Sequence, residues 1–135
     1  MKLRALLVLT ISFALTFAAI PAFPHHGFAA EFDIKKPITI TGTLTKIEWT
    51  NPHAFLYIDA KDETGKVVNW AFELGSPNGL MRRGWTRHSL KVGDTITVDG
   101  YCAKDGSRIA NARSVKLSDG RTVFAGSPDD GGPAQ

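Results

Sequence analysis

Cysteine is almost absent from this sequence, and Cys102 is the only one among 135 residues. A single cysteine cannot form an intramolecular disulfide, and the lack of a Cys-x-x-Cys pair removes a common zinc and dithiol motif. Cys102 follows Tyr101 at the end of an apolar alternation, which predicts a buried strand residue. A reactive thiol or an intermolecular bridge is the alternative.

Recognisable catalytic motifs are also missing. The chain has no G-x-S-x-G nucleophile turn and no glycine-rich phosphate loop, and Gly65-Lys66 lacks the rest of a P-loop. Asp59, Asp62 and Glu63 cluster around a predicted hairpin turn, where charges are usually solvated. These absences favour a non-enzymatic protein, with a hydrolase built from scattered Ser, His and Asp residues as the alternative.

Charges are lacking near the N-terminus, where Lys2 and Arg4 are the only ones before Glu31. An apolar run from Ala5 to Ile20 follows them, and Pro21 closes it. This layout predicts a secretory signal peptide over residues 1–24, cleaved near residues 22–24. A transmembrane anchor is the alternative, but the run is shorter than the roughly 20 residues of a spanning helix, so we expect no membrane span after cleavage. The mature protein should be periplasmic or secreted.

A strong net charge is absent from the mature chain. The whole sequence has 16 Lys plus Arg and 13 Asp plus Glu, a net charge of +3. Removal of Lys2 and Arg4 leaves 14 against 13, a net charge of +1. A chain so close to neutral has no general attraction for nucleic acid, and we expect none as a partner. Its length suits one small domain.

Alternation of apolar and polar residues with period two dominates the mature sequence. It predicts strands over residues 37–50, 54–62, 67–74, 95–102 and 108–117, and a short sixth strand after the Asp119-Gly120 turn. In the first strand the alternation slips by one residue, which predicts a bulge near Thr45–Lys46. We expect residues 25–124 to form one domain and residues 125–135 to be a disordered Gly/Pro/Asp tail.

A short helix should separate the third and fourth strands. Ser76 is a good N-cap, Pro77 suits the first helical position, and Gly84 can end the turn. Leu80 and Met81 should face inward. Three strands, a helix and two further strands are the order of an OB-type barrel. The predicted fold is therefore all-β, a small OB-like barrel of five to six strands with one short helix between strands three and four.

Four stretches, HHGFAAEFD, EWTNPHAF, NWAFELGSPNGLMRRGWTR and LKVGDTITVDGY, make the mature chain similar to a known family. It resembles a family of small exported bacterial proteins known only as a domain of unknown function, over residues 25 to about 124. The resemblance implies an exported, mostly β domain in a Gram-negative bacterium. It implies no catalytic residues.

Histidines are the first candidates for a functional site. His25 and His26 stand at the predicted mature N-terminus, and His53 follows Pro52 in the turn between the first two strands. Together they could bind copper or zinc, with Glu31 or Glu48 as a carboxylate ligand. The alternative is a pair of solvated histidines, with His53 bonded to a backbone carbonyl.

A ligand-binding face is the second candidate. OB-type barrels bind ligands across strands two and three, and an arginine-rich stretch beside a tryptophan suits an anionic or sugar-like ligand. The candidate residues are Tyr57, Asn69, Glu73, Arg82, Arg83, Trp85 and Arg87. Trp85 could instead plug the barrel, with the arginines solvating the helix end.

Taken together, these patterns predict an exported periplasmic binding or accessory module that is not an enzyme. Its partner would be a small anion, a glycan or an envelope protein. The alternative is a periplasmic copper- or zinc-binding protein that uses His25, His26 and His53.

Overall fold

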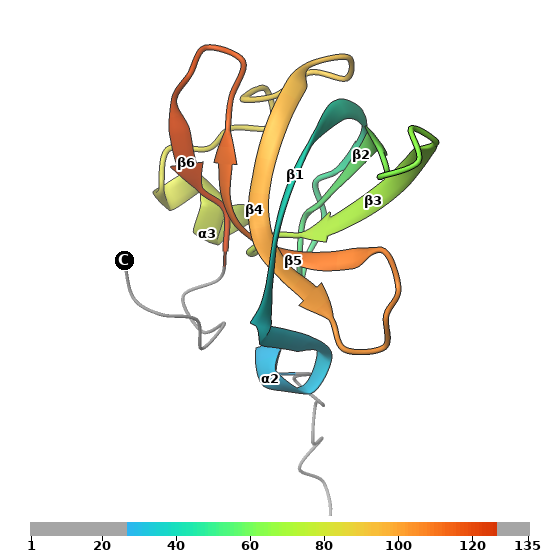
Figure 1. Ribbon diagram of the computed structural model, residues 1–135. Helices are drawn as coiled ribbons and strands as arrows, with labels where there is room; N and C mark the ends of the chain where they lie inside the picture. The colour runs from blue at the N-terminus through green and yellow to red at the C-terminus, as the bar shows by residue number, and fades with distance from the viewer. Residues whose placement is uncertain (1–26, 127–135) are drawn as a thin grey trace, which may run out of the picture.

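A computed structural model describes residues 27–126 of the protein. The described chain is mostly antiparallel β-sheet (Figure 1), which confirms the predicted all-β class. The elements in chain order are α2 (Phe28–Glu31), β1 (Phe32–Glu48), β2 (Phe55–Lys61), β3 (Val67–Glu73), α3 (Pro77–Arg82), β4 (Thr95–Ala103), β5 (Ile109–Lys116) and β6 (Thr122–Phe124).

The strands form one sheet in the order β3-β2-β1-β4-β5-β6. β3 and β5 also pair with each other in parallel, with Ala71 opposite Ile109 and Glu73 opposite Asn111. This pairing closes the strands β3-β2-β1-β4-β5 into a ring. The result is a barrel-like ring with α3 between β3 and β4 in the chain, as the OB-like prediction required (Figure 1). Closure of this kind removes sheet edges that a small open sheet would leave exposed.

The long strand β1 serves both halves of the ring because it bends. Its first part pairs with β4 and its last part pairs with β2. The register with β2 shifts between Leu44 and Lys46, which confirms the predicted bulge. At Gly42 the neighbouring strand passes so close that an added Cβ would lie 2.3 Å from the carbonyl oxygen of Asp59. Only glycine permits this approach.

The core lies inside the ring and follows the period-two alternation. Leu56 and Ile58 of β2, and Phe72 of β3, are fully buried. The segment after β3 adds Leu80 and Trp85 to the same cluster.

Helix α3 covers part of this core and begins as the sequence predicted. Its N-cap is Ser76, whose Oγ accepts a hydrogen bond from the Gly79 N–H at 3.2 Å. Leu80 faces inward, as predicted. Met81 does not, because its side chain is 50% exposed. A helix of six residues has only one face against the core, and Pro77 and Leu80 occupy it.

The two ends of the described chain extend further than the sequence indicated. Strand β1 begins at Phe32 rather than residue 37, preceded by the short α2 at the lower end of the ring in Figure 1. Ala125, placed by the sequence in the tail, is fully buried, and its backbone bonds to Arg113 and Gly75. The packed structure therefore includes Ala125. The predicted signal peptide and residues 127–135 lie outside the described residues.

In β4, Ile96, Val98 and Gly100 are buried, as the alternation predicted. Cys102 is only half-buried and carries a free thiol.

Candidate ligand-binding face

The outer surface of β1, β2 and β3 carries most of the candidate ligand contacts, and the strand register decides which of them meet. Because Leu56 and Ile58 point into the core, Phe55, Tyr57 and Asp59 of β2 point outward. Lys46 stands opposite Tyr57, because the bulge at Thr45 moves it there. We use the term outer face for this surface of β1–β3.

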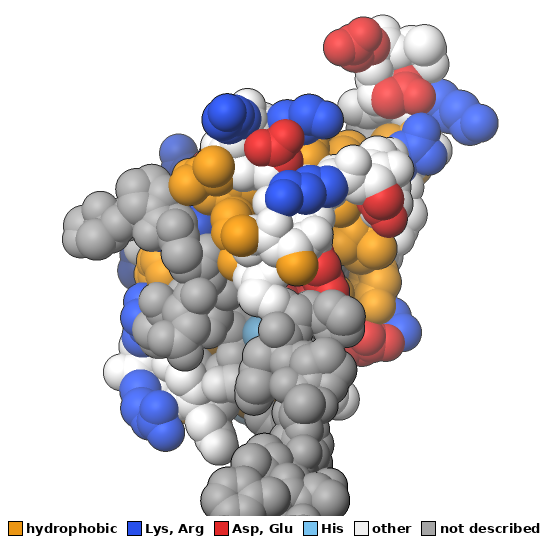
Figure 2. All heavy atoms as spheres, turned by 90° about the horizontal axis from the view of Figure 1, so that it is seen from below, with side chains coloured by type: hydrophobic (Ala, Val, Ile, Leu, Met, Phe, Trp, Pro, Cys, Tyr) orange, Lys and Arg blue, Asp and Glu red, His pale blue; other side chains and the backbone are white. Residues whose placement is uncertain are grey.

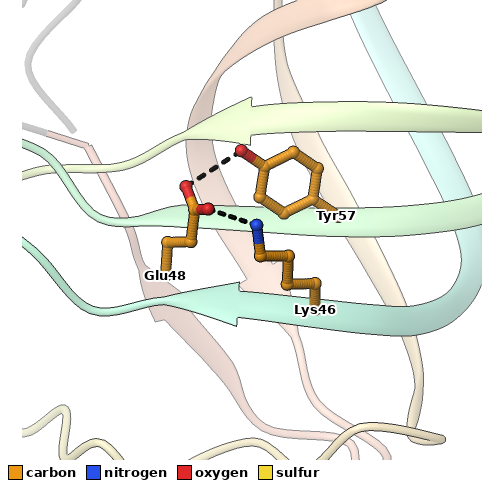
Figure 3. Close-up of polar contacts among 3 residues, drawn as sticks. All are labelled: Lys46, Glu48 and Tyr57. Carbon is orange, nitrogen blue, oxygen red and sulfur yellow. Dashed lines mark hydrogen bonds and ion pairs between the residues drawn. The ribbon is translucent and has the colours of Figure 1, made fainter.

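Three side chains of the outer face form one polar network (Figure 3). Lys46 forms an ion pair with Glu48, two residues along β1. The Tyr57 hydroxyl donates a hydrogen bond to Glu48 Oε2 at 2.9 Å. The Lys46 ammonium also lies 5.0 Å from the centroid of the Tyr57 ring, within cation–π range.

Hydrogen bonding sets the protonation states of this network. The bond from Lys46, followed by that from Tyr57, lowers the pKa of Glu48. The same carboxylate raises the pKa of Tyr57 and that of Lys46, chiefly by accepting their hydrogen bonds. All three shifts favour one state at neutral pH, with Glu48 ionised, Lys46 charged and Tyr57 protonated.

A second polar group lies beside the network on β3. Asn69 stands opposite Asp59, and its Nδ2 donates to Asp59 Oδ1 at 2.7 Å. The same nitrogen lies 3.4 Å from Thr45 Oγ1, and the Thr45 hydroxyl donates to the Tyr57 carbonyl at 3.1 Å. The bulged residue thus links the polar groups of β1 and β3 across β2.

Aromatic rings give the outer face its apolar part. Phe55 and Tyr57 are both half-buried, and their ring centroids lie 6.4 Å apart with an interplanar angle of 29°. Rings stacked along one strand present a continuous apolar ledge. The ledge is flanked by Lys46 and Glu48 of β1 on one side and by Ala71 and Glu73 of β3 on the other.

Glu73 and His53 lie at one end of the outer face. Glu73 pairs with Phe55 in the register, and its Oε1 is 3.6 Å from His53 Nδ1. His53 Nδ1 also lies 3.0 Å from the Leu74 carbonyl oxygen. A carbonyl can only accept, so Nδ1 carries the proton and Nε2 keeps its lone pair in the neutral ring.

The arginine-rich stretch has different partners from the outer face. The Arg83 guanidinium lies 4.1 Å from the centroid of the Phe124 ring on β6. Trp85, which the sequence grouped with the arginines as a ligand contact, is only 3% exposed. Its Nε1 donates to the Phe124 carbonyl at 2.8 Å. Trp85 is therefore a core residue, and its ring is not presented to a ligand.

The structure thus divides the predicted ligand-binding residues into two groups. Tyr57, Asn69 and Glu73 belong to the outer face, whereas Arg82, Arg83 and Arg87 are exposed in the stretch of chain that contains the buried Trp85. Sequence reasoning missed Phe55 and Lys46, and it named Glu48 only as a metal ligand. The i, i+2 spacing of Lys46 and Glu48 was a usable signal, but their meeting with Tyr57 depends on the bulge register.

The lower end of the ring has a shallow groove beside α2, lined chiefly by Phe28, Phe32, Ile34, Lys35 and Lys104. The space-filling view of this end shows hydrophobic side chains interspersed with basic and acidic ones (Figure 2). Between residues 27 and 126, no three His, Cys, Asp or Glu side chains group as metal ligands. The candidate ligands His25 and His26 lie outside that range. No helix in the same range has the length and apolarity to cross a membrane.

Fold and topology define a small all-β protein, a barrel-like ring of strands with an aromatic and polar outer face. Residues 14–112 match the family of unknown function DUF6152, and the protein belongs to this family. The match confirms the resemblance seen in the sequence. A search among curated proteins found no match.

Proposed function

We propose that the protein is an exported periplasmic binding module that holds a glycan on its outer face. The apolar N-terminal segment supports export. The stacked Phe55–Tyr57 ledge beside the Lys46–Glu48–Tyr57 network is the observation that carries the ligand class. Sugar rings have apolar faces and hydroxyl edges, so they match an aromatic ledge bordered by donors and acceptors.

Charge on the outer face favours a glycan over a small anion. Lys46 is already paired with Glu48, and Asp59 and Glu73 add negative charge nearby. An anionic ligand would meet these carboxylates, whereas a neutral hydroxyl-rich ligand can accept from Lys46 and donate to the acids. OB-type barrels use strands two and three for oligosaccharides, which agrees with the position of the ledge.

The proposal is tested by titrating the mature protein with a panel of soluble oligosaccharides of neutral hexoses and N-acetylhexosamines. Binding is followed by calorimetry and by amide chemical shifts. We expect shift changes on β2 and β3, and loss of binding in a Phe55→Ala/Tyr57→Ala variant. Tyr57→Phe keeps the ring but loses the bond to Glu48, so it should bind more weakly than wild type.

The matched control is Thr97→Ala, an outward residue of β4 whose hydroxyl bonds to Thr41. It should bind like wild type. Equal affinities of the wild type and the double alanine variant would refute the ledge as the binding site. If no oligosaccharide in the panel bound, the glycan assignment would fail.

A second candidate function is copper or zinc binding, because the bond from His53 to a backbone carbonyl, which a histidine without a metal also makes, leaves Nε2 free to bind one. His53 donates from Nδ1 to a backbone carbonyl, the arrangement that orients a histidine to bind a metal through Nε2. We propose His25 and His26 of the mature N-terminus as the further ligands. Copper titration of the processed protein should give an electron paramagnetic resonance spectrum that changes in His53→Ala. His88→Ala, in an exposed loop, is the control; an unchanged spectrum in His53→Ala would exclude this function.

A further inference from the structure

Acidic residues are absent from the sequence between Glu73 and Asp94, although the chain has 13 of them. The same interval carries four cations, Arg82, Arg83, Arg87 and Lys91, and all four are exposed. We refer to residues 81–92 as the basic segment. A mature chain of almost neutral net charge therefore concentrates positive charge in one stretch.

Buried anchors hold the basic segment against the ring. Leu80, Trp85 and Leu90 are each at most 5% exposed, and the indole of Trp85 is fixed by its bond to the Phe124 carbonyl. The residues between these anchors consequently face solvent. Thr86 and Ser89 bond to one another through backbone and side chain, which closes a tight turn under Arg87. The cations are thus presented from a fixed backbone, which lowers the entropic cost of binding.

Within the described part of the chain, no carboxylate neutralises these cations. None of the four side chains forms an ion pair with a residue in the range 27–126. Arg83 instead lies on the Phe124 ring, which positions its guanidinium without reducing its charge. Their full charge is therefore available to an external anionic partner.

Apolar side chains stand at both ends of the basic segment. Met81 is 50% exposed and Val92 is 64% exposed, two of the largest apolar exposures in the described structure. Binding of a soluble anion would not bury these apolar side chains, whereas the boundary between lipid headgroups and acyl chains can bury them. Basic residues combined with exposed apolar ones are the chemistry of proteins that lie on anionic bilayers.

We propose that the basic segment attaches the exported protein to the surface of a bilayer containing anionic phospholipid. The cations contact headgroup phosphates, and Met81 and Val92 enter the interfacial layer. This attachment is peripheral and does not depend on the outer face. The binding module would then act next to a membrane rather than free in solution.

The test is co-sedimentation of the mature protein with vesicles of phosphatidylcholine alone or mixed with phosphatidylglycerol. We expect binding only to the mixed vesicles, weakened by added salt. Because each basic residue near an anionic surface contributes about fivefold in affinity, the Arg82→Gln/Arg83→Gln/Arg87→Gln variant should lose on the order of a hundredfold. Met81→Ser/Val92→Ser should bind more weakly, with the deficit persisting at high salt.

The matched control is Lys61→Gln/Lys66→Gln/Arg108→Gln, which removes the same charge from exposed positions at the ends of other strands. It should bind close to wild type, and circular dichroism should show that both triple variants fold. Equal losses in the two variants would indicate net charge alone and overturn the proposal. Absence of binding to the mixed vesicles would also overturn it, as would displacement by millimolar inorganic phosphate, which would indicate a soluble-anion site.

Discussion

Glu48 holds the polar network of the outer face together, because it bonds to both Lys46 and Tyr57. Its two oxygens have separate partners, so each of the neighbouring side chains has a defined orientation. A ligand that reached the ledge would meet polar groups already in place rather than mobile side chains.

Acid titration should distinguish Glu48 from an ordinary surface glutamate. Its pKa is lowered in the folded protein from an ordinary value of 4.5. Glu48 therefore adds stability above that pH, and the contribution is lost as pH falls through the lowered folded value. The Tm of Glu48→Gln should be below that of wild type at neutral pH, and the two should converge in acid.

Thermal unfolding at a series of pH values measures this effect. Glu63→Gln, at an exposed position in the β2–β3 turn, is the control and should change Tm little at any pH. A difference between wild type and Glu48→Gln that stayed constant into strong acid would contradict the role assigned to the carboxylate.

At the scale of single elements, close approach of strands constrains β1 and β4 at one glycine each. An added Cβ at Gly42 would lie 2.3 Å from the Asp59 carbonyl oxygen, and one at Gly100 would lie 2.0 Å from that of Asn111. These neighbours are backbone atoms of paired strands, which cannot rotate away as a side chain could.

Gly100→Ala and Gly42→Ala should each destabilise the protein by about 2 kcal/mol or more, because the neighbouring strand must shift. Urea denaturation followed by tryptophan fluorescence measures the change. Gly27→Ala is the matched control, since nothing lies within 4 Å of its added Cβ. Wild-type stability in Gly100→Ala would show that β4 and β5 can separate without cost.

Local sequence patterns were enough to predict most elements, including the bulge and the N-cap of α3. They failed where pairing between strands that are far apart in the sequence determines the structure. The charged residues Asp33, Lys35 and Lys36 hide the alternation at the start of β1, where Phe32 pairs with Ala103 of β4 across an irregular register before regular pairing starts at Pro37. Likewise, the period-two pattern places Tyr57 on the outer face, but only the register brings Lys46 to it.

On the scale of the whole molecule, ring closure makes distant segments depend on one another. The parallel β3–β5 contact covers only three residue pairs, from Ala71 to Glu73 on β3. Ala125 bonds to residues that follow the paired segments of both strands. Its N–H donates to the Arg113 carbonyl, and its carbonyl accepts from the Gly75 N–H, both at 2.9 Å.

A chain ended after Phe124 should therefore be less stable than one ended after Gly126. The shorter chain loses the buried Ala125 and two backbone hydrogen bonds, each with a net contribution of about 1 kcal/mol. We expect a loss of about 2 kcal/mol, measured by urea denaturation of the two chains. Equal stabilities would place Ala125 with the tail, as its sequence suggested.

Gly75 stands where three separate stretches of backbone meet. Its carbonyl accepts from the Ala54 N–H beside His53, its N–H donates to Ala125, and Leu74 before it donates to the Ala54 carbonyl. These hydrogen bonds connect Ala54, next to Phe55 of the outer face, to Ala125 near the end of the described chain. Hydrogen exchange at the Gly75 amide should therefore slow when a ligand occupies Phe55 and Tyr57. The buried amide of Gly75 would then report the occupancy of both rings.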